Sequence, residues 1–303
     1  MRRGTSTVIG SLAKVAAMAV AVLACRQLTR RRFAEAHASR FRLSDRGIVV
    51  GAEPIALDAS PTHAVLLLHG FNDTPQSLQP LADALHAAGW TVRVPLLPGH
   101  GRSIDEFVNA RAADWLAHAR AEFDALRASH TTVALCGQSM GAALAALIAS
   151  ETPDLPVLAL ISPFIGVPRD LALKFHAAWI PQLLFPYRSS AAGRRSIHDP
   201  AARARALSLG VVNARILAQL RTSALAAEAA LPAVRTPVLF IQSREDNRVS
   251  VDRGEHNFAL LGSHQREQRW LTGCGHIVTV DYCKDEVARA TNDWLVRWAG
   301  APR

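Results

Sequence analysis

The feature that most constrains this chain is a glycine–serine–glycine pattern between a buried strand and an apolar helix. Residues 133–136 predict the strand, Gly137-Gln138-Ser139-Met140-Gly141 follows directly, and residues 140–150 predict an Ala- and Leu-rich helix. A tight strand-to-helix turn holds its serine in a strained backbone conformation, and flanking glycines let neighbouring backbone approach closely. The helix N-terminus also favours negative charge beside the serine. Ser139 is therefore our candidate nucleophile.

A serine hydroxyl needs a base and an orienting acid, which are expected in the order serine, acid, histidine. His276 lies late in the chain, in the glycine loop Gly273-Cys274-Gly275-His276 that follows a predicted strand at 268–271. Asp246 lies between the two, directly after a predicted strand at 237–242. We predict that Asp246 orients the His276 imidazole. The neighbouring Glu245 is the alternative acid.

Acyl transfer also needs donors that stabilise a developing oxyanion. One donor is expected to be the backbone N–H of Met140, which follows the nucleophile. The second should come from the loop after an early buried strand. Residues 63–69 predict that strand, and His69-Gly70-Phe71 follows it. We therefore predict the Phe71 N–H as the second donor.

The rest of the chain alternates short apolar runs with helical patterns, which predicts an α/β fold with a mostly parallel central sheet. Residues 47–162 and 237–303 form the predicted core. The interval 163–236 is far longer than a crossover connection needs, so we predict a helical cap inserted there. Ordinary extra helices that pack against the core are the alternative. Apolar residues of this interval are candidates for a substrate pocket: Phe164, Ile165, Trp179 and Phe185.

Positive charge is concentrated at the N-terminus. The chain has 34 Lys and Arg against 25 Asp and Glu, and residues 1–46 hold 10 of these cations and two of the acids. Residues 47–303 are therefore nearly neutral, which argues against a nucleic-acid partner. A basic segment beside an apolar run indicates a targeting or membrane role instead.

Residues 1–46 allow four interpretations. The uncharged run Val15–Cys25 is as short as the core of a signal peptide, and Val22-Leu23-Ala24-Cys25 resembles a lipoprotein cleavage box. Four arginines follow between 26 and 32, and such charges stay on the cytoplasmic side. We favour an uncleaved anchor, with association at the bacterial inner membrane. A cleaved signal or lipoprotein signal, a peripheral basic segment and a start codon assigned too early are the alternatives.

The sequence offers little for other chemistries. Its 12 histidines form no H-E-x-x-H or similar cluster, so we expect no metal. No G-x-G-x-x-G follows a first strand, so we expect no dinucleotide. The four cysteines form neither a C-x-x-C pair nor a dense framework. A bridge between Cys274 and Cys283 is compatible with the spacing but does not follow from it.

These motifs together resemble the α/β-hydrolase fold and, more narrowly, the bacterial carboxylesterase and monoacylglycerol-lipase-like group. The similarity spans residues 50–298. It implies a cap over an acyl pocket, no cofactor, and hydrolysis of short-to-medium acyl esters or monoglycerides. The motifs that carry it are His69-Gly70-Phe71 with Pro75, Pro98-Gly99-His100-Gly101, Gly137–Gly141, Asp246 with Val249, and Gly275-His276-Ile277-Val278-Thr279-Val280-Asp281.

We therefore expect a serine hydrolase that acts on a small or lipid-derived ester. A peptidase of the proline-iminopeptidase type, a C–C bond hydrolase or an acyltransferase on the same fold is the first alternative. The stretch 163–231 holds few acids and many arginines, which argues against an aminopeptidase that must bind a substrate amine. A non-catalytic, membrane-associated binding protein is the second alternative, since one fold can serve many functions.

Overall fold

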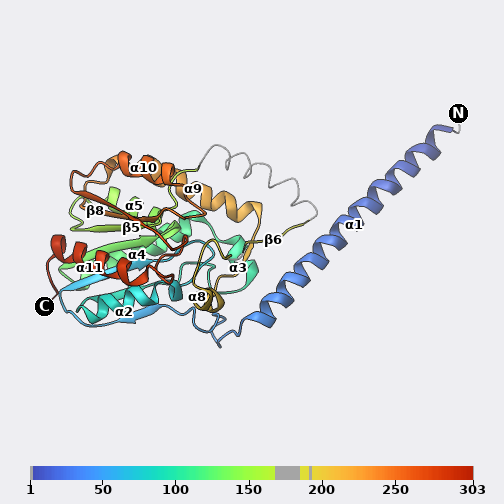
Figure 1. Cartoon of the computed structure of the whole chain (residues 1–303). Coiled ribbons are helices and arrows are strands. Elements are labelled where there is room, and N and C mark those ends of the chain that lie inside the picture. Colours follow the sequence, from blue (N-terminus) through green and yellow to red (C-terminus); the bar gives the residue numbers. More distant parts are fainter. Residues whose placement is uncertain (1–2, 168–184, 191–192, 303) are drawn as a thin grey trace.

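The computed structural model describes residues 3–167, 185–190 and 193–302 (Figure 1). Its centre is a seven-stranded sheet in the order β1-β3-β2-β4-β5-β8-β9. Only β1 runs antiparallel to its neighbour, and the other pairings are parallel. The predicted α/β fold with a mostly parallel sheet is thus confirmed. The strands are β1 Ile55–Leu57, β2 His63–Leu68, β3 Thr91–Val94, β4 Thr132–Gln138, β5 Leu158–Ile161, β8 Val238–Ser243 and β9 Arg266–Leu271.

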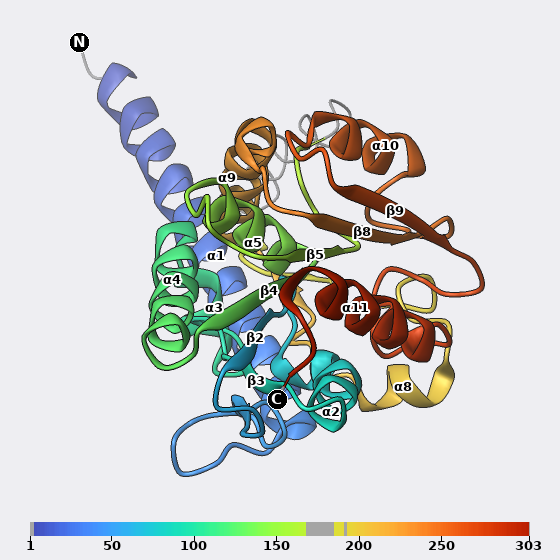
Figure 2. The ribbon, with the colours of Figure 1, turned by 90° about the vertical axis from the view of Figure 1, so that its left-hand side faces the viewer.

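Helices cover both faces of the sheet, because the central strands are apolar on both sides. In β2, Leu66 and Leu68 belong to one hydrophobic core, whereas Val65 and Leu67 belong to the other. Figure 2 shows the resulting layers, with α2 and α11 on one side of the sheet. The helices are α2 Gln79–Ala87 and α11 Lys284–Ala299 on that face, and α3 Ile104–Asn109, α4 Ala112–Ser129, α5 Met140–Ser150 and α9 Ala214–Ala230 on the other.

Two element boundaries differ from the sequence prediction, one beside a proline and one in a strand with charged residues. The predicted helix at 75–88 is a 3-10 turn, η1 Pro75–Leu78, followed by α2. Pro80 lacks the N–H that a continuous α-helix would need, so the two segments are separate. Strand β9 begins at Arg266, two residues before the predicted start. As an edge strand it carries charged residues that hide its pattern.

The interval 163–236 holds two described helices, as the sequence allowed. They are α8 Pro200–Arg205, capped by the Asp199 side chain, and α9, capped by Asn213. A short antiparallel pair, β6 Arg188–Ser189 with β7 Val211–Val212, and the turn η2 Leu231–Ala233 complete its described elements. Helix α9 also buries Ile216 and Ala227 in the main core. The division into core and cap stays a prediction.

The N-terminal segment forms one helix, α1 Arg3–Arg40, which projects away from the sheet (Figure 1). Near its C-terminal end the Phe33 ring packs edge-on against Tyr187, with centroids 5.8 Å apart, and Arg40 donates to the Ala206 carbonyl. In the described part of the chain, no helix is both long and apolar enough to cross a membrane. The membrane anchor and the association with the inner membrane stay predictions.

Candidate active site

Ser139 stands at the turn between β4 and α5 in a strained conformation. Its φ of +55° and ψ of −115° lie outside the regions that non-glycine residues normally adopt. The two motif glycines make room for this turn. A Cβ on Gly141 would lie 2.0 Å from the Leu68 carbonyl oxygen, and one on Gly137 would lie 2.3 Å from the Gly141 oxygen. The local sequence thus fixes where the serine hydroxyl stands.

The structure brings Ser139, His276 and Asp246 together. His276 Nε2 lies 2.9 Å from Ser139 Oγ, and His276 Nδ1 lies 2.8 Å from Asp246 Oδ2. All three side chains are nearly inaccessible to solvent. Because Nδ1–H donates to the carboxylate, Nε2 is left as an acceptor for the serine proton.

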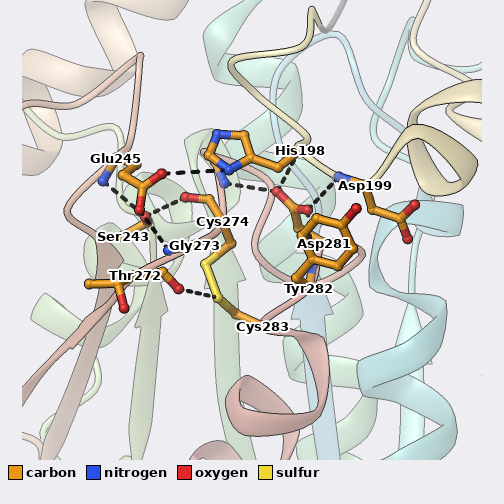
Figure 3. Close-up of a disulfide and its surroundings, with 11 residues drawn as sticks. His198, Asp199, Ser243, Glu245, Thr272, Gly273, Cys274, Asp281, Tyr282 and Cys283 are labelled. Atoms are coloured by element: carbon orange, nitrogen blue, oxygen red, sulfur yellow. Dashed lines mark hydrogen bonds and ion pairs between the residues drawn. A yellow bond between two sulfur atoms is a disulfide. The ribbon is translucent and has the colours of Figure 1, made fainter.

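The loop after β8 separates the roles of its two acids. Asp246 Oδ1 accepts the N–H groups of Arg248 and Val249 at 2.7 and 3.0 Å, which leaves Oδ2 for the histidine. Glu245 turns elsewhere. Its carboxylate accepts the Gly273 N–H at 2.6 Å and lies 3.7 Å from His198 Nδ1, as Figure 3 shows. The geometry therefore favours Asp246 over Glu245 as the partner of the base.

A disulfide between Cys274 and Cys283 encloses the loop that carries His276 (Figure 3). The bridge joins two residues nine positions apart. The Ser243 hydroxyl, at the end of β8, donates to the Cys274 carbonyl. The disulfide therefore closes the loop that carries His276, and the Ser243 hydrogen bond attaches this loop to β8, the strand that precedes Asp246. The sequence allowed this pairing without predicting it.

Asp281 anchors the same loop to the segment before α8. Its two oxygens accept four backbone N–H groups, at 2.8–2.9 Å, from Gly275, Tyr282, His198 and Asp199. Burial alone would raise the pKa of Asp281, but these hydrogen bonds outweigh it and the pKa is lowered. The ionised Asp281 carboxylate thus holds the loop that carries His276 in place.

We expect Asp281→Asn to lower the free energy of unfolding by about 2–3 kcal/mol at pH 7, because its amide group would face two N–H donors. The folded pKa lies below the ordinary value of 3.8. The stability that the ionised Asp281 carboxylate contributes to the fold is therefore fully present above that value, and it disappears as the pH falls through the folded pKa. Urea unfolding at pH 7 and near pH 3 should show the deficit shrinking with acid. Asp285→Asn, at an exposed site, is the control, and an equal deficit at both pH values would contradict the account.

Gln138 links the serine turn to the base loop. The Thr279 hydroxyl lies 2.6 Å from Gln138 Oε1 and 2.7 Å from the Ser77 carbonyl. Both Gln138 and Thr279 are buried. The Thr279 hydroxyl thus lies between three segments that are distant in the sequence, and Gln138 is its contact in the serine turn.

The loop after β2 lies directly against the serine. A Cβ on Gly70 would be 3.2 Å from Ser139 Cβ. Buried His69 accepts the Leu97 N–H at Nε2, and its Nδ1 donates to the Gly70 carbonyl, so the ring is held neutral. Burial lowers the pKa of His69 well below its usual value. These contacts position the Phe71 backbone.

His100 supports the Phe71 side chain. Its ring packs edge-on against Phe71, Phe107 and Trp115 at centroid distances of 6.3, 5.0 and 5.7 Å. Burial lowers the pKa of His100 to about 4, so it stays neutral at physiological pH. The structure therefore places His100 in the scaffold of the site.

A cavity of about 340 Å³ opens onto Ser139 and His276. Its apolar wall comes partly from Phe71 and partly from the interval 163–236. Leu217 and Leu220, which share one face of α9, were not identified from the sequence, although their i, i+3 spacing was a usable signal. Within the described ranges, no three His, Cys, Asp or Glu side chains gather where they could hold a metal ion.

The four residues predicted for the pocket have different positions. Phe164 lines the cavity. Ile165 is buried in the core beside it and does not contribute to the lining. Phe185 is 52% exposed and lies in a separate groove with Phe33 of α1. Trp179 lies outside the described residues. Hydrophobicity alone could not separate a pocket wall from a core or a surface position.

The polar lining was also missed. It includes the buried Asn72 and Asp73 and the exposed Arg188, Asn247 and Arg248. Asn72 adopts a φ of +58°, and its Oδ1 accepts the Gly210 N–H at 3.2 Å. No local pattern distinguishes these residues from those of an ordinary polar loop.

The sheet order, the serine turn and the hydrogen-bonded serine and histidine define an α/β-hydrolase, and its sequence relatives are lipases and esterases. Residues 59–282 match the profile of the serine aminopeptidase S33 family, and the chain belongs to this family.

Individual relatives agree with that class. A thermostable monoacylglycerol lipase from Bacillus sp. (strain H-257) is 28% identical over 256 residues, which cover 84% of this chain and 98% of the relative. A solved structure from work on the metagenome-derived lipolytic enzymes LipS and LipT superposes with a TM-score of 0.74 at 30% identity, covering 82% of this chain and 98% of the other. The monoacylglycerol lipase of Paleococcus ferrophilus gives 0.69 at 19% identity, covering 80% and 98%.

Proposed function

We propose that this chain is a serine esterase that cleaves carboxylic esters through an acyl-enzyme on Ser139. The observation that carries the proposal is the pair of hydrogen bonds that joins Ser139 Oγ through His276 to Asp246. Ser139 Oγ attacks the ester carbonyl while His276 Nε2 takes its proton, and the alcohol leaves with that proton. Water then attacks the acyl-enzyme with the same base, which releases the acid and restores the serine.

The backbone N–H groups of Phe71 and Met140 are the proposed oxyanion donors. Met140 is the first residue of α5, where N–H groups have no partner inside the helix. Neither N–H donates to a residue in the described part of the chain. Because Gly70 packs against Ser139, the Phe71 N–H that follows it lies beside the serine. Two preorganised donors of this kind stabilise the charge that develops on the carbonyl oxygen.

The size and lining of the cavity support a small or medium ester. Its 340 Å³ lies at the small end of ligand sites. Because Phe164, Leu217 and Leu220 line it, we propose that the interval 163–236 acts as a cap over the site. The relatives named monoacylglycerol lipase support monoglycerides among the candidate substrates.

Hydrolysis of p-nitrophenyl esters by the full chain, from acetate to laurate, tests this function. We expect turnover with an optimum at short-to-medium acyl length, and covalent labelling of Ser139 by a fluorophosphonate. Absence of both turnover and labelling would contradict the proposal. Labelling without turnover on any ester would favour the peptidase, C–C hydrolase or acyltransferase alternatives.

A further inference from the structure

Asp73 is a buried acid for which the proposed mechanism has no use. Its side chain lines the same cavity as Ser139 and His276, and the residue is 7% exposed. It comes two residues after Phe71, in the loop whose Gly70 touches the serine. A substituent next to the reacting carbonyl would therefore lie close to this carboxylate.

The contacts of Asp73 leave part of its capacity to accept hydrogen bonds unused. Its Oδ1 accepts the Thr74 N–H at 2.9 Å. The Ser77 hydroxyl, which also lowers the pKa of Asp73, donates to the Thr74 carbonyl at 3.1 Å. No Arg or Lys that the structure describes forms an ion pair with it. A carboxylate offers about four acceptor positions, so further donors can bind.

An ionised carboxylate at this position works against folding. Burial raises the pKa of Asp73 to about 6, although its hydrogen bonds and the nearby His276 oppose the shift. An acid whose pKa is higher in the folded state than in the unfolded chain destabilises the fold at neutral pH. Costly polar groups of this kind are concentrated at functional sites.

The charge around the cavity indicates which donor Asp73 would accept. Arg188 and Arg248 line the same cavity and form no ion pair with the acids in the described ranges. Their positive charges disfavour a substrate ammonium group. A neutral hydroxyl is the donor that remains compatible with both the carboxylate and the arginines.

We propose that Asp73 accepts a hydrogen bond from a hydroxyl that the substrate carries close to its ester, which makes the enzyme selective for hydroxylated esters. The inference rests on the proposed esterase function. The hydroxyl belongs either to the alcohol part, as in a glyceryl ester, or to the acyl part, as in a hydroxyacyl ester. Both sources present the same chemistry to Asp73.

Two matched substrate pairs test the inference with the full chain. Glyceryl monobutyrate against propyl butyrate tests the alcohol part, and ethyl 3-hydroxybutyrate against ethyl butyrate tests the acyl part. In Asp73→Asn, kcat/KM for the hydroxylated member of one pair should fall by about tenfold or more, with the plain member changing little. Asp73→Ser, which removes the carboxylate without adding an amide, should do the same. Asp83→Asn makes the identical change on the exposed part of α2. In each substrate pair, it should leave the ratio of kcat/KM for the hydroxylated member to kcat/KM for the plain member unchanged.

Each result has a defined meaning. The pair that responds identifies the part of the substrate that carries the hydroxyl. The melting temperature of Asp73→Asn at pH 7.5 should rise, because the substitution removes an unfavourable buried charge. Unchanged ratios in both Asp73 variants, with Ser139-dependent hydrolysis in the unmodified chain, would overturn this inference alone. No hydrolysis of any ester by the unmodified chain would overturn the proposed function and this inference with it.

Discussion

Ser139→Ala is expected to lower kcat for ester hydrolysis by about 10⁶-fold, the loss typical when the nucleophile of such a triad is removed. The variant lacks the oxygen that forms the acyl-enzyme, so His276 has no hydroxyl to deprotonate. The backbone conformation at position 139 is equally strained with serine or alanine, and the variant should therefore fold. Initial rates on p-nitrophenyl butyrate, with circular dichroism of both proteins, measure the two effects.

Ser162→Ala is a closely matched control. Ser162 is also buried, follows the neighbouring strand β5 and has a positive φ of +43°. Its hydroxyl has no hydrogen-bond partner among the described residues. Substituting it makes the same chemical change in a similar backbone, and kcat should change little. Equal losses in both variants would mean that local packing, rather than the missing nucleophile, lowers the rate.

The parts of the site that the sequence predicted depend on short-range chemistry. A positive φ at a serine, with glycines two residues before and after it, leaves a local pattern because a Cβ at Gly137 or Gly141 would collide with backbone. The approach of Asp246 and His276 to Ser139 also follows from chain order, since the carboxyl ends of parallel strands meet at one edge of the sheet.

Features that depend on tertiary packing could not be predicted in this way. The cavity wall formed by Leu217 of α9 and the exposure of Phe185 depend on how the interval 163–236 folds back, and hydrophobicity is similar in either position. The four N–H groups around Asp281 come from two separate segments and leave no pattern in either. The apolar N-terminal run is part of one long helix, Arg3–Arg40, whose full length the sequence pattern did not indicate.

Asp246→Asn should lower kcat by about 10⁴-fold, through the tautomer of the base. The N–H groups of Arg248 and Val249 hold one side-chain oxygen, so the asparagine carbonyl must take that position. The amide NH₂ then faces His276 Nδ1, which can only accept from it. The ring proton moves to Nε2, where it opposes the Ser139 hydroxyl and prevents proton transfer.

Glu245→Gln separates this mechanism from a general loss of negative charge in the loop. Glutamine retains an oxygen that can accept the Gly273 N–H, and the carboxylate bonded to His276 Nδ1 is that of Asp246. We therefore expect Glu245→Gln to keep kcat within a few-fold of the unmodified chain, measured on the same ester and at the same pH as Asp246→Asn. A large loss in Glu245→Gln with little loss in Asp246→Asn would assign the orienting role to Glu245. Similar moderate losses in both would indicate that the charge of the loop, and not the tautomer of His276, controls the rate.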